Sequence, residues 1–311
     1  MKKKYLIIVL LVMFAIDIQA QQNPHYTQYM YNMNIMNPAY AGSKEGLSGG
    51  LLYRAQWVGI DGAPKTATFS IHSPIGKNVG LGISVISDKI GPVEEKNVNG
   101  DFSYTLNLGG ENRLALGLKA GANFQNIGLF SEIGNGNIVQ PGDLAFSQNS
   151  NTAKLNIGTG LFYYSKKYYA ALSIPNMLNT KYLTVTNNGQ EYKFGSTIQH
   201  YFLTSGYVFD LSQETKFKPS FMLKSAFKAP VSLDLSANFL FFDKLESGIT
   251  YRLGDSYGAM INFAVTPSIR LGYAYDHIIS DLKTTAPASH EFMLLFDLNL
   301  PKKVSISPRF F

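Results

Sequence analysis

The segment "VSLDLSANFLF", residues 231–241, alternates apolar and polar side chains from Val231 to Phe239. Successive side chains of a β-strand point to opposite faces of the sheet. One face of this strand therefore carries leucine and phenylalanine, while the other carries serine, asparagine and Asp234. The pattern predicts a strand whose one side lies in an apolar environment and whose other side lies in a polar one.

The same period of two recurs along nearly the whole chain after residue 45 and predicts fourteen strands. They span 46–57, 65–73, 78–88, 95–107, 112–126, 153–165, 167–174, 192–210, 215–228, 230–242, 244–253, 256–266, 268–278 and 289–300. An even number of strands is typical of single-chain bacterial outer-membrane barrels.

The connections between these strands are sorted by length. Those after even-numbered strands are short, such as "PIGK" (74–77) and "DK" (243–244), whereas long ones, such as "KIGPVEEK" (89–96) and those within 127–152 and 176–191, follow odd-numbered strands. A barrel with both termini in the periplasm has short periplasmic turns and long external loops. The sorting favours a 14-stranded antiparallel transmembrane β-barrel over a secreted β-sandwich or jelly roll, the other all-β folds considered.

The two faces of the strands also differ in the way a barrel requires. The apolar face ends in aromatic residues, which form girdles at membrane–water interfaces. These are Tyr53, Trp57, Tyr251, Tyr257, Tyr273 and Tyr275. The opposite face is rich in Gly, Ser, Asn and Thr, and its charged members are predicted to line the lumen: Arg54, Lys119, Asp234, Arg252 and Arg270.

The first 20 residues carry an export signal. Three lysines precede the apolar run 5–16, and Ala20 supplies a small residue before a cleavage point at Ala20/Gln21. A retained membrane anchor is the alternative, but a spanning helix needs roughly 20 apolar residues. We expect a signal peptide (1–20), an N-terminal plug or periplasmic mouth segment (21–45), a barrel (46–300) and a periplasmic tail (301–311).

Composition excludes several functions. With no cysteine there is no disulfide, thiolate metal site or lipid-carrying cysteine. Without residues 1–20, 24 basic residues face 20 acidic ones, a balance that gives no reason to predict nucleic-acid binding. The five histidines show no metal-ligand spacing, and Asp276-His277 is interpreted as a loop pair. We predict no enzyme, no cofactor and no metal.

Several motifs together resemble a known family. They are "QYMYNMNIMNPAYAGS" (28–43), "YRAQWVGIDGAPKTATFSIHSP" (53–74), "NVGLGISVISDKIGP" (78–92), "HYFLTSGYVFDLS" (200–212), "KFKPSFMLK" (216–224), "SLDLSANFLF" (232–241), "IRLGYAYD" (269–276) and "SPRFF" (307–311). In this order and spacing they resemble the PorP/SprF family, outer-membrane proteins of the type IX secretion and gliding-motility machinery of Bacteroidetes. The matching signature residues are Asn37, Pro38, Ala39, Tyr40, Gly42, Tyr53, Arg54, Gln56, Trp57, Asp88, Lys89, Gly91 and Pro92.

The resemblance implies a non-enzymatic barrel in the outer membrane of a Gram-negative bacterium, exported through the Sec pathway. It implies help in the secretion or surface attachment of large proteins with a C-terminal sorting domain, such as gliding adhesins. The partners implied are that cargo, the periplasmic ring and the peptidoglycan-associated components, in addition to outer-membrane lipid. The cargo would meet the long loops 127–152 and 176–191.

The C-terminal tail has two interpretations. Its candidate docking residues for the ring are Lys302, Lys303, Arg309, Phe310 and Phe311. The basic charges favour an acidic partner surface. Alternatively, the tail ends in aromatics because outer-membrane assembly recognises a terminal Phe.

Two other segments allow more than one interpretation. The uncharged stretch "NPHYTQYMYNMNIMNPAYAGS" (23–43) is interpreted as an internal plug rather than a cofactor site, because an uncharged segment enters a barrel at low desolvation cost. In "YRAQW" (53–57), an inward Arg54 either anchors a plug or loop through charge-assisted hydrogen bonds, or the motif is only a girdle followed by an Asp-Gly turn.

Two alternative functions remain. A fatty-acid-transporter-like channel for small hydrophobic molecules has the same strand number, although such transporters carry a longer N-terminal hatch than the 25 or so residues here. An outer-membrane hydrolase would use Ser48 of "GLSGG" (46–50) as nucleophile. That motif opens a strand here instead of following one, which disfavours a nucleophile elbow.

Overall fold

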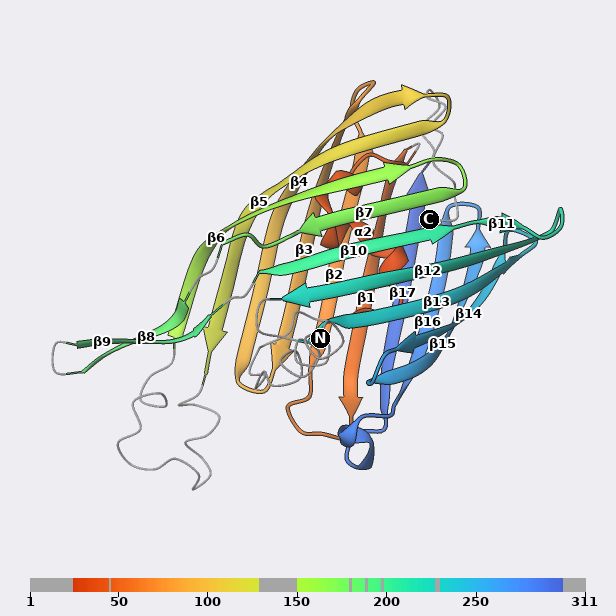
Figure 1. Cartoon of the computed structure of the whole chain (residues 1–311). Helices are drawn as coiled ribbons and strands as arrows, with labels where there is room; N and C mark the ends of the chain where they lie inside the picture. The colour runs from red at the N-terminus through yellow and green to blue at the C-terminus, as the bar shows by residue number, and fades with distance from the viewer. Residues whose placement is uncertain are drawn as a thin grey trace, which may run out of the picture.

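The computed structural model describes residues 25–44, 46–128, 150–178, 181–187, 190–196, 199–226 and 230–298. Within these ranges fourteen antiparallel strands form a closed barrel (Figure 1). The ring runs in chain order, β1 pairs with β17, and the pairing of β10 with β12 completes it. The strands are β1 (Leu47–Val58), β2 (Lys65–Pro74), β3 (Val79–Ile90), β4 (Val93–Gly109), β5 (Asn112–Ile127), β6 (Ser150–Tyr164), β7 (Tyr168–Ile174), β10 (His200–Tyr207), β12 (Thr215–Ala226), β13 (Ser232–Phe241), β14 (Leu245–Arg252), β15 (Ser256–Thr266), β16 (Ile269–Ile278) and β17 (Ala288–Leu298).

The predicted all-β barrel and its strand number are confirmed, and two details are wrong. The predicted strand 192–210 is divided: β9 (Gln190–Ser196) pairs with β8 (Lys181–Asn187) in a separate hairpin, and only β10 enters the wall, followed by the short β11 (Phe209–Asp210). Alternation continues through this stretch, so the pattern does not show where the hydrogen-bonding partner changes.

The predicted long loop 89–96 is also wrong. β3 and β4 continue up to a tight turn at Gly91, which has a φ of +53°, and Pro92. Charged residues of this stretch remain in strands and pair across them, as Lys89 does with Glu94. Outside the bilayer a strand can carry charges on both faces, so polarity alone does not indicate a loop.

The side chains alternate between the outside and the lumen as predicted. On β13, Leu235 is exposed on the outer surface while Asp234 and Asn238 are buried inside. Of the predicted girdle residues, Tyr53, Tyr251 and Tyr257 are exposed, whereas Tyr273 and Tyr275 are half-buried. Trp57 departs from the pattern because its φ is +54° and the β1–β17 register shifts between Ala55 and Val58, which makes a bulge there.

The wall is uneven in height. Strands β4, β5 and β6 have 17, 16 and 15 residues, whereas β7 and β10 have 7 and 8. A transmembrane strand needs about 9–11 residues, so β4–β6 project well past β7 and β10 on one side (Figure 1). We call that side, where the β5–β6 and β7–β10 connections lie, the long-loop end. The side at which β1 starts and β17 finishes is the short-turn end.

Residues 25–44, which we call the inner segment, lie inside the ring of strands (Figure 1). The segment contains three short turns of helix, η1 (Tyr29–Tyr31), α2 (Met33–Met36) and η2 (Pro38–Tyr40). His25 contacts Lys224 near the long-loop end, while Lys44 pairs with Asp297 near the short-turn end. The segment therefore runs along the lumen from the long-loop end to the short-turn end, and residue 25 lies towards the end opposite to Leu298.

None of the helices in the described ranges is long and apolar enough to cross a membrane.

Candidate functional site

The inner segment packs against apolar side chains that face inward from the wall. Tyr29, Met30, Met33 and Tyr40 are all at most 5% exposed. The ring of Tyr40 meets Phe162 of β6 edge-on at 5.2 Å between centroids. Fully burying a large apolar side chain contributes about 1.5–3 kcal/mol, so this small core holds the segment firmly inside the barrel.

An ion cluster around Arg54 holds Thr27 and Gln28, in the part of the inner segment nearer the long-loop end, against the wall. Arg54 is 1% exposed, and its guanidinium lies 2.7 Å from Asp276 Oδ2 and 3.2 Å from Glu291 Oε2. The same guanidinium donates to Thr27 Oγ1 at 2.8 Å. The backbone N–H groups of Thr27 and Gln28 donate to the Glu291 carboxylate at 2.9 and 2.8 Å. Inner segment, β1, β16 and β17 thus share one buried network.

A second ion cluster holds the middle of the segment. Lys119 of β5 lies 2.5 Å from Asp101 of β4 and donates to Ser84 Oγ at 2.8 Å. The side-chain amide of Asn34 donates to the other oxygen of Asp101 at 3.2 Å. Because a buried charge is costly unless paired and hydrogen-bonded, this arrangement specifies one position for α2.

A third cluster lies on the opposite wall. The Tyr31 hydroxyl donates to Glu246, and the ammonium of Lys218 stands 4.6 Å from the centroid of the Tyr31 ring, a cation–π geometry. Glu246 also accepts from the Asn238 amide at 3.0 Å and lies 3.6 Å from Arg270. The three clusters involve strands on all sides of the barrel, so the inner segment is held across the lumen and not against one wall.

The "NPAYAG" residues dock where the wall has no side chains. The Asn37 side chain accepts from Ala39 N and donates to Leu161 O, both at 2.9 Å. A Cβ at Gly160 would lie 2.0 Å from Asn37 Oδ1, and one at Gly117 would lie 2.1 Å from Ala39 N. Gly42, with a φ of +70°, then turns the chain towards β1. Asn37, Pro38, Ala39, Tyr40 and Gly42 therefore fit a matching glycine surface.

The remaining signature residues lie elsewhere. Asp88 accepts from Thr66 Oγ1 at 2.6 Å, and Gly91 N donates to Gly62 O at 2.8 Å, which joins two turns at the long-loop rim. Of the other five, Tyr53, Gln56 and Trp57 lie on β1, Lys89 lies on β3, and Pro92 completes the β3–β4 turn. None of these five residues, nor Asp88 or Gly91, joins the three clusters as described.

Sequence reasoning missed most of the partners of these clusters. The interpretation of Asp276 as part of a loop pair is wrong, because Asp276 lies in β16, 2% exposed, beside Arg54. Glu291, Asp101 and Lys218 were not singled out. Each occupies an inward position of a period-two strand, and a charge at such a position is the signal that indicates a lumen partner.

Ser48 does not form a hydrolase site. It stands opposite His72 on β2 and Asp297 on β17, so serine separates the other two residues. In a catalytic triad the histidine must lie between serine and carboxylate. His72 Nδ1 instead accepts from Gly42 N at 3.1 Å. Within the described residues no group of three or more acidic or histidine side chains is placed to hold a metal ion.

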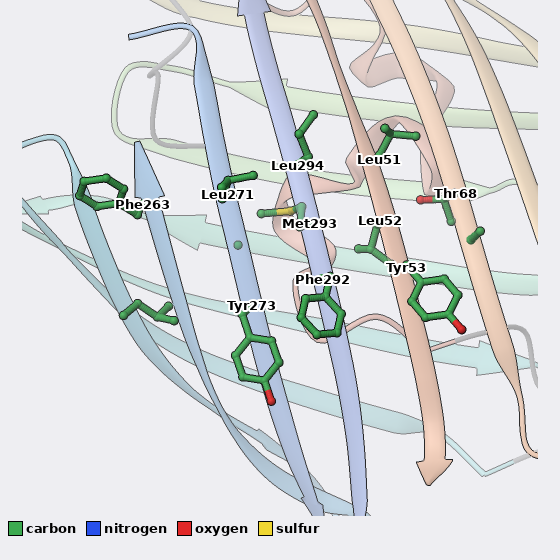
Figure 2. A pocket seen from close by; sticks show the side chains of 13 residues that line it. Leu51, Leu52, Tyr53, Thr68, Phe263, Leu271, Tyr273, Phe292, Met293 and Leu294 are labelled. Carbon is green, nitrogen blue, oxygen red and sulfur yellow. The ribbon is translucent and has the colours of Figure 1, made fainter. Parts of the chain in front are cut away.

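A groove of about 650 Å³ lies on the outer surface between β15 and β2. Its lining is almost entirely apolar, and Tyr53, Tyr273 and Phe292 stand along it on neighbouring strands (Figure 2). Such a surface suits the hydrocarbon of a bilayer. The tail residues Lys302, Lys303, Arg309, Phe310 and Phe311 lie outside the described residues, as does most of loop 127–152.

Comparison with known proteins identifies the family. The profile described as "Type IX secretion system membrane protein PorP/SprF" matches residues 18–296. The chain belongs to this family. No curated protein sequence matches it. As a PorP/SprF barrel it is an outer-membrane protein of a secretion system, and its family and fold are those of membrane secretion or transport proteins rather than of a known enzyme class.

Solved barrels share the fold at low sequence identity. A FadL homologue of Pseudomonas aeruginosa matches with a TM-score of 0.51 and 10% identity, over 90% of this chain and 96% of that one. The CymD monoaromatic hydrocarbon channel matches with a TM-score of 0.48 and 12% identity, over 89% and 94% of the two chains. Omp33 of Acinetobacter baumannii has a TM-score of 0.44 and 10% identity, over 83% and 100%. At these identities the likeness concerns the fold alone.

Proposed function

We propose that this barrel is a non-enzymatic accessory of type IX secretion, which helps to secrete or retain at the surface large proteins carrying a C-terminal sorting domain, such as gliding adhesins. Its partners are that cargo together with the periplasmic ring and peptidoglycan-associated components. The family match supports the secretion role. The short-turn end faces the periplasm in this proposal, because outer-membrane barrels keep their short turns there.

The observation that carries the proposal is the occupied lumen. Three buried ion clusters and a tyrosine–methionine core fix the inner segment, which acts as a plug. A transported solute would have to separate buried charges from their partners, which is costly. The barrel is therefore a static docking platform, and its long-loop end meets the cargo while the tail 301–311 meets the ring.

A channel for small hydrophobic molecules is the second candidate, favoured by the fold shared with a FadL homologue. The two functions predict different results for the purified protein. Reconstituted in liposomes, an accessory barrel gives no more solute flux than empty vesicles, whereas a channel gives robust flux. Flux through the wild-type protein would overturn the accessory role.

The positive test is co-purification of a tagged chain from its native outer membrane. We expect a large surface protein and periplasmic ring components to be recovered with it. A paralogous barrel of the same membrane, tagged in the same way, controls for abundance. Recovery of the barrel alone, with unchanged secretion in a strain lacking it, would refute the proposal.

A further inference from the structure

Within the described residues, the projecting part of β6 has no partner strand on the side away from β5, and we call this its free edge. β5 pairs with β6 along its whole length, from Ser150 to Tyr164, but β7 pairs only with Thr159–Tyr164. Pro175 directly follows β7, and proline has no N–H to continue a ladder. One more backbone bond, from Met177 N to Ile157 O at 2.8 Å, ends the contact on that side.

The register shows which backbone groups this leaves open. In an antiparallel ladder every second residue directs its N–H and C=O to the same neighbour. Ile157 faces away from β5, so Asn151, Ala153 and Leu155 do so too. Among the described residues nothing pairs with their backbone. β8 approaches β6 but pairs only with β9. The open stretch 150–156 is about 20 Å long at 3.3 Å per residue.

The inner face beside this edge carries side-chain oxygens without hydrogen-bond partners. Asn97, Asn123 and Gln125, on β4 and β5, are 7, 8 and 5% exposed. Their side-chain oxygens have no partner, nor has the Thr152 hydroxyl on β6 itself. Two of the amide nitrogens, those of Asn97 and Asn123, already donate to Glu95 at 2.9 and 2.7 Å. The face thus presents acceptors in rows parallel to the open edge.

We propose that the free edge of β6 binds an extended segment of the secreted partner by strand addition. The occupant is a polypeptide because the edge offers alternating backbone donors and acceptors that another strand matches. Its inward side chains are long donors, such as Arg, Lys or Gln, because the unpartnered oxygens lie one and two strands away. This inference rests on the proposed function and names where the cargo binds.

Native proteins usually cover or blunt such an edge with proline, lysine or a bulge. Here Lys154 is the one charged residue in 150–156, and its side chain lies on the inner face, opposite Asn123. Backbone pairing carries the contact, so the binding should depend little on salt, unlike a contact between exposed charges.

Site-specific photo-crosslinking in living cells tests the location. A benzoyl-phenylalanine in place of Leu155 sits on the outer face beside the open edge, where Leu155 is 63% exposed. The matched control replaces Val98, which is 44% exposed in the same row on β4 and paired on both sides. We expect a crosslink to a type IX-secreted protein, identified by mass spectrometry, at position 155 and not at 98.

The substitution Ala153→Pro tests the chemistry. It removes an N–H that points to the open edge, so the β5 ladder remains, and proline is tolerated at such edge positions. We expect normal outer-membrane levels and heat-modifiable mobility, with the Leu155 crosslink and cargo retention lost. Ala153→Gly, which keeps the N–H, should retain both.

Each other outcome overturns the inference. A crosslink to residues 181–196 of the same chain, to a second copy of the barrel, or equally at both positions assigns the edge to another occupant. Cargo retention unchanged in Ala153→Pro refutes strand addition while leaving the accessory function intact. If the wild-type barrel retains no cargo and its loss leaves secretion unchanged, the proposed function itself fails.

Discussion

Replacing Arg54 with methionine should destabilise the barrel strongly. The substitution keeps a long apolar stem but removes the only cation within 3.2 Å of both Asp276 and Glu291 in the described structure. Two carboxylates then remain buried side by side, and Thr27 loses a donor. Breaking a buried ion pair by removing one partner costs about 3–5 kcal/mol. At about 1.4 kcal/mol per tenfold, the unfolding constant should rise by roughly two to four powers of ten.

The assay is urea unfolding of the refolded barrel in lipid vesicles, followed by tryptophan fluorescence and heat-modifiable mobility. Lys216→Met is the matched control, because Lys216 forms an exposed pair with Asp243 and such pairs contribute about 0–1 kcal/mol. Adding Glu291→Gln to Arg54→Met should recover part of the loss, since one of the two unpaired charges disappears. A loss below about 1 kcal/mol for Arg54→Met would refute the view that this cluster holds the inner segment.

Three further predictions concern the same architecture. Gly160→Ala forces a methyl group against the inner segment and should cost about 1–3 kcal/mol of unfolding free energy in the same assay. The control Gly100→Ala, whose new Cβ meets nothing closer than 3.8 Å, should cost less than Gly160→Ala. Lys119→Met leaves Asp101 buried without its cation and should cost about 3–5 kcal/mol; if Asp101→Asn in addition fails to recover stability, the ion pair is not the cause. Deleting 301–311 should leave membrane insertion normal and abolish secretion; lost insertion would instead assign the tail to barrel assembly.

The sequence predicts the barrel well because each wall strand obeys one local rule. Alternation at Leu235, Asp234 and their neighbours follows directly from the environment on each face, and loop lengths indicate which ends lie together. The same rule cannot reveal a change of hydrogen-bonding partner, so it predicts one strand over 192–210 where the structure has β9 and β10 in different sheets. Pairing is a long-range property that a local pattern does not contain.

The site was less accessible from sequence. The inner segment stood out because a run of Tyr, Met and Asn without charge precedes the first strand. Its wall partners did not, because Arg54 meets Asp276 and Glu291 from more than 200 residues away, as the spacing of 237 residues to Glu291 shows. Only the closure of the ring brings them together. The glycines that receive Asn37 and Ala39 were equally invisible among the many glycines of the chain.

The inner segment changes the number of times that the described chain passes from one end of the barrel to the other, from even to odd. It adds one traverse of the lumen to fourteen traverses of the wall, and an odd number of passages leaves the first and last described residues facing different compartments. His25 therefore lies towards the external end of the barrel and Leu298 at the periplasmic end, if the short turns face the periplasm as proposed.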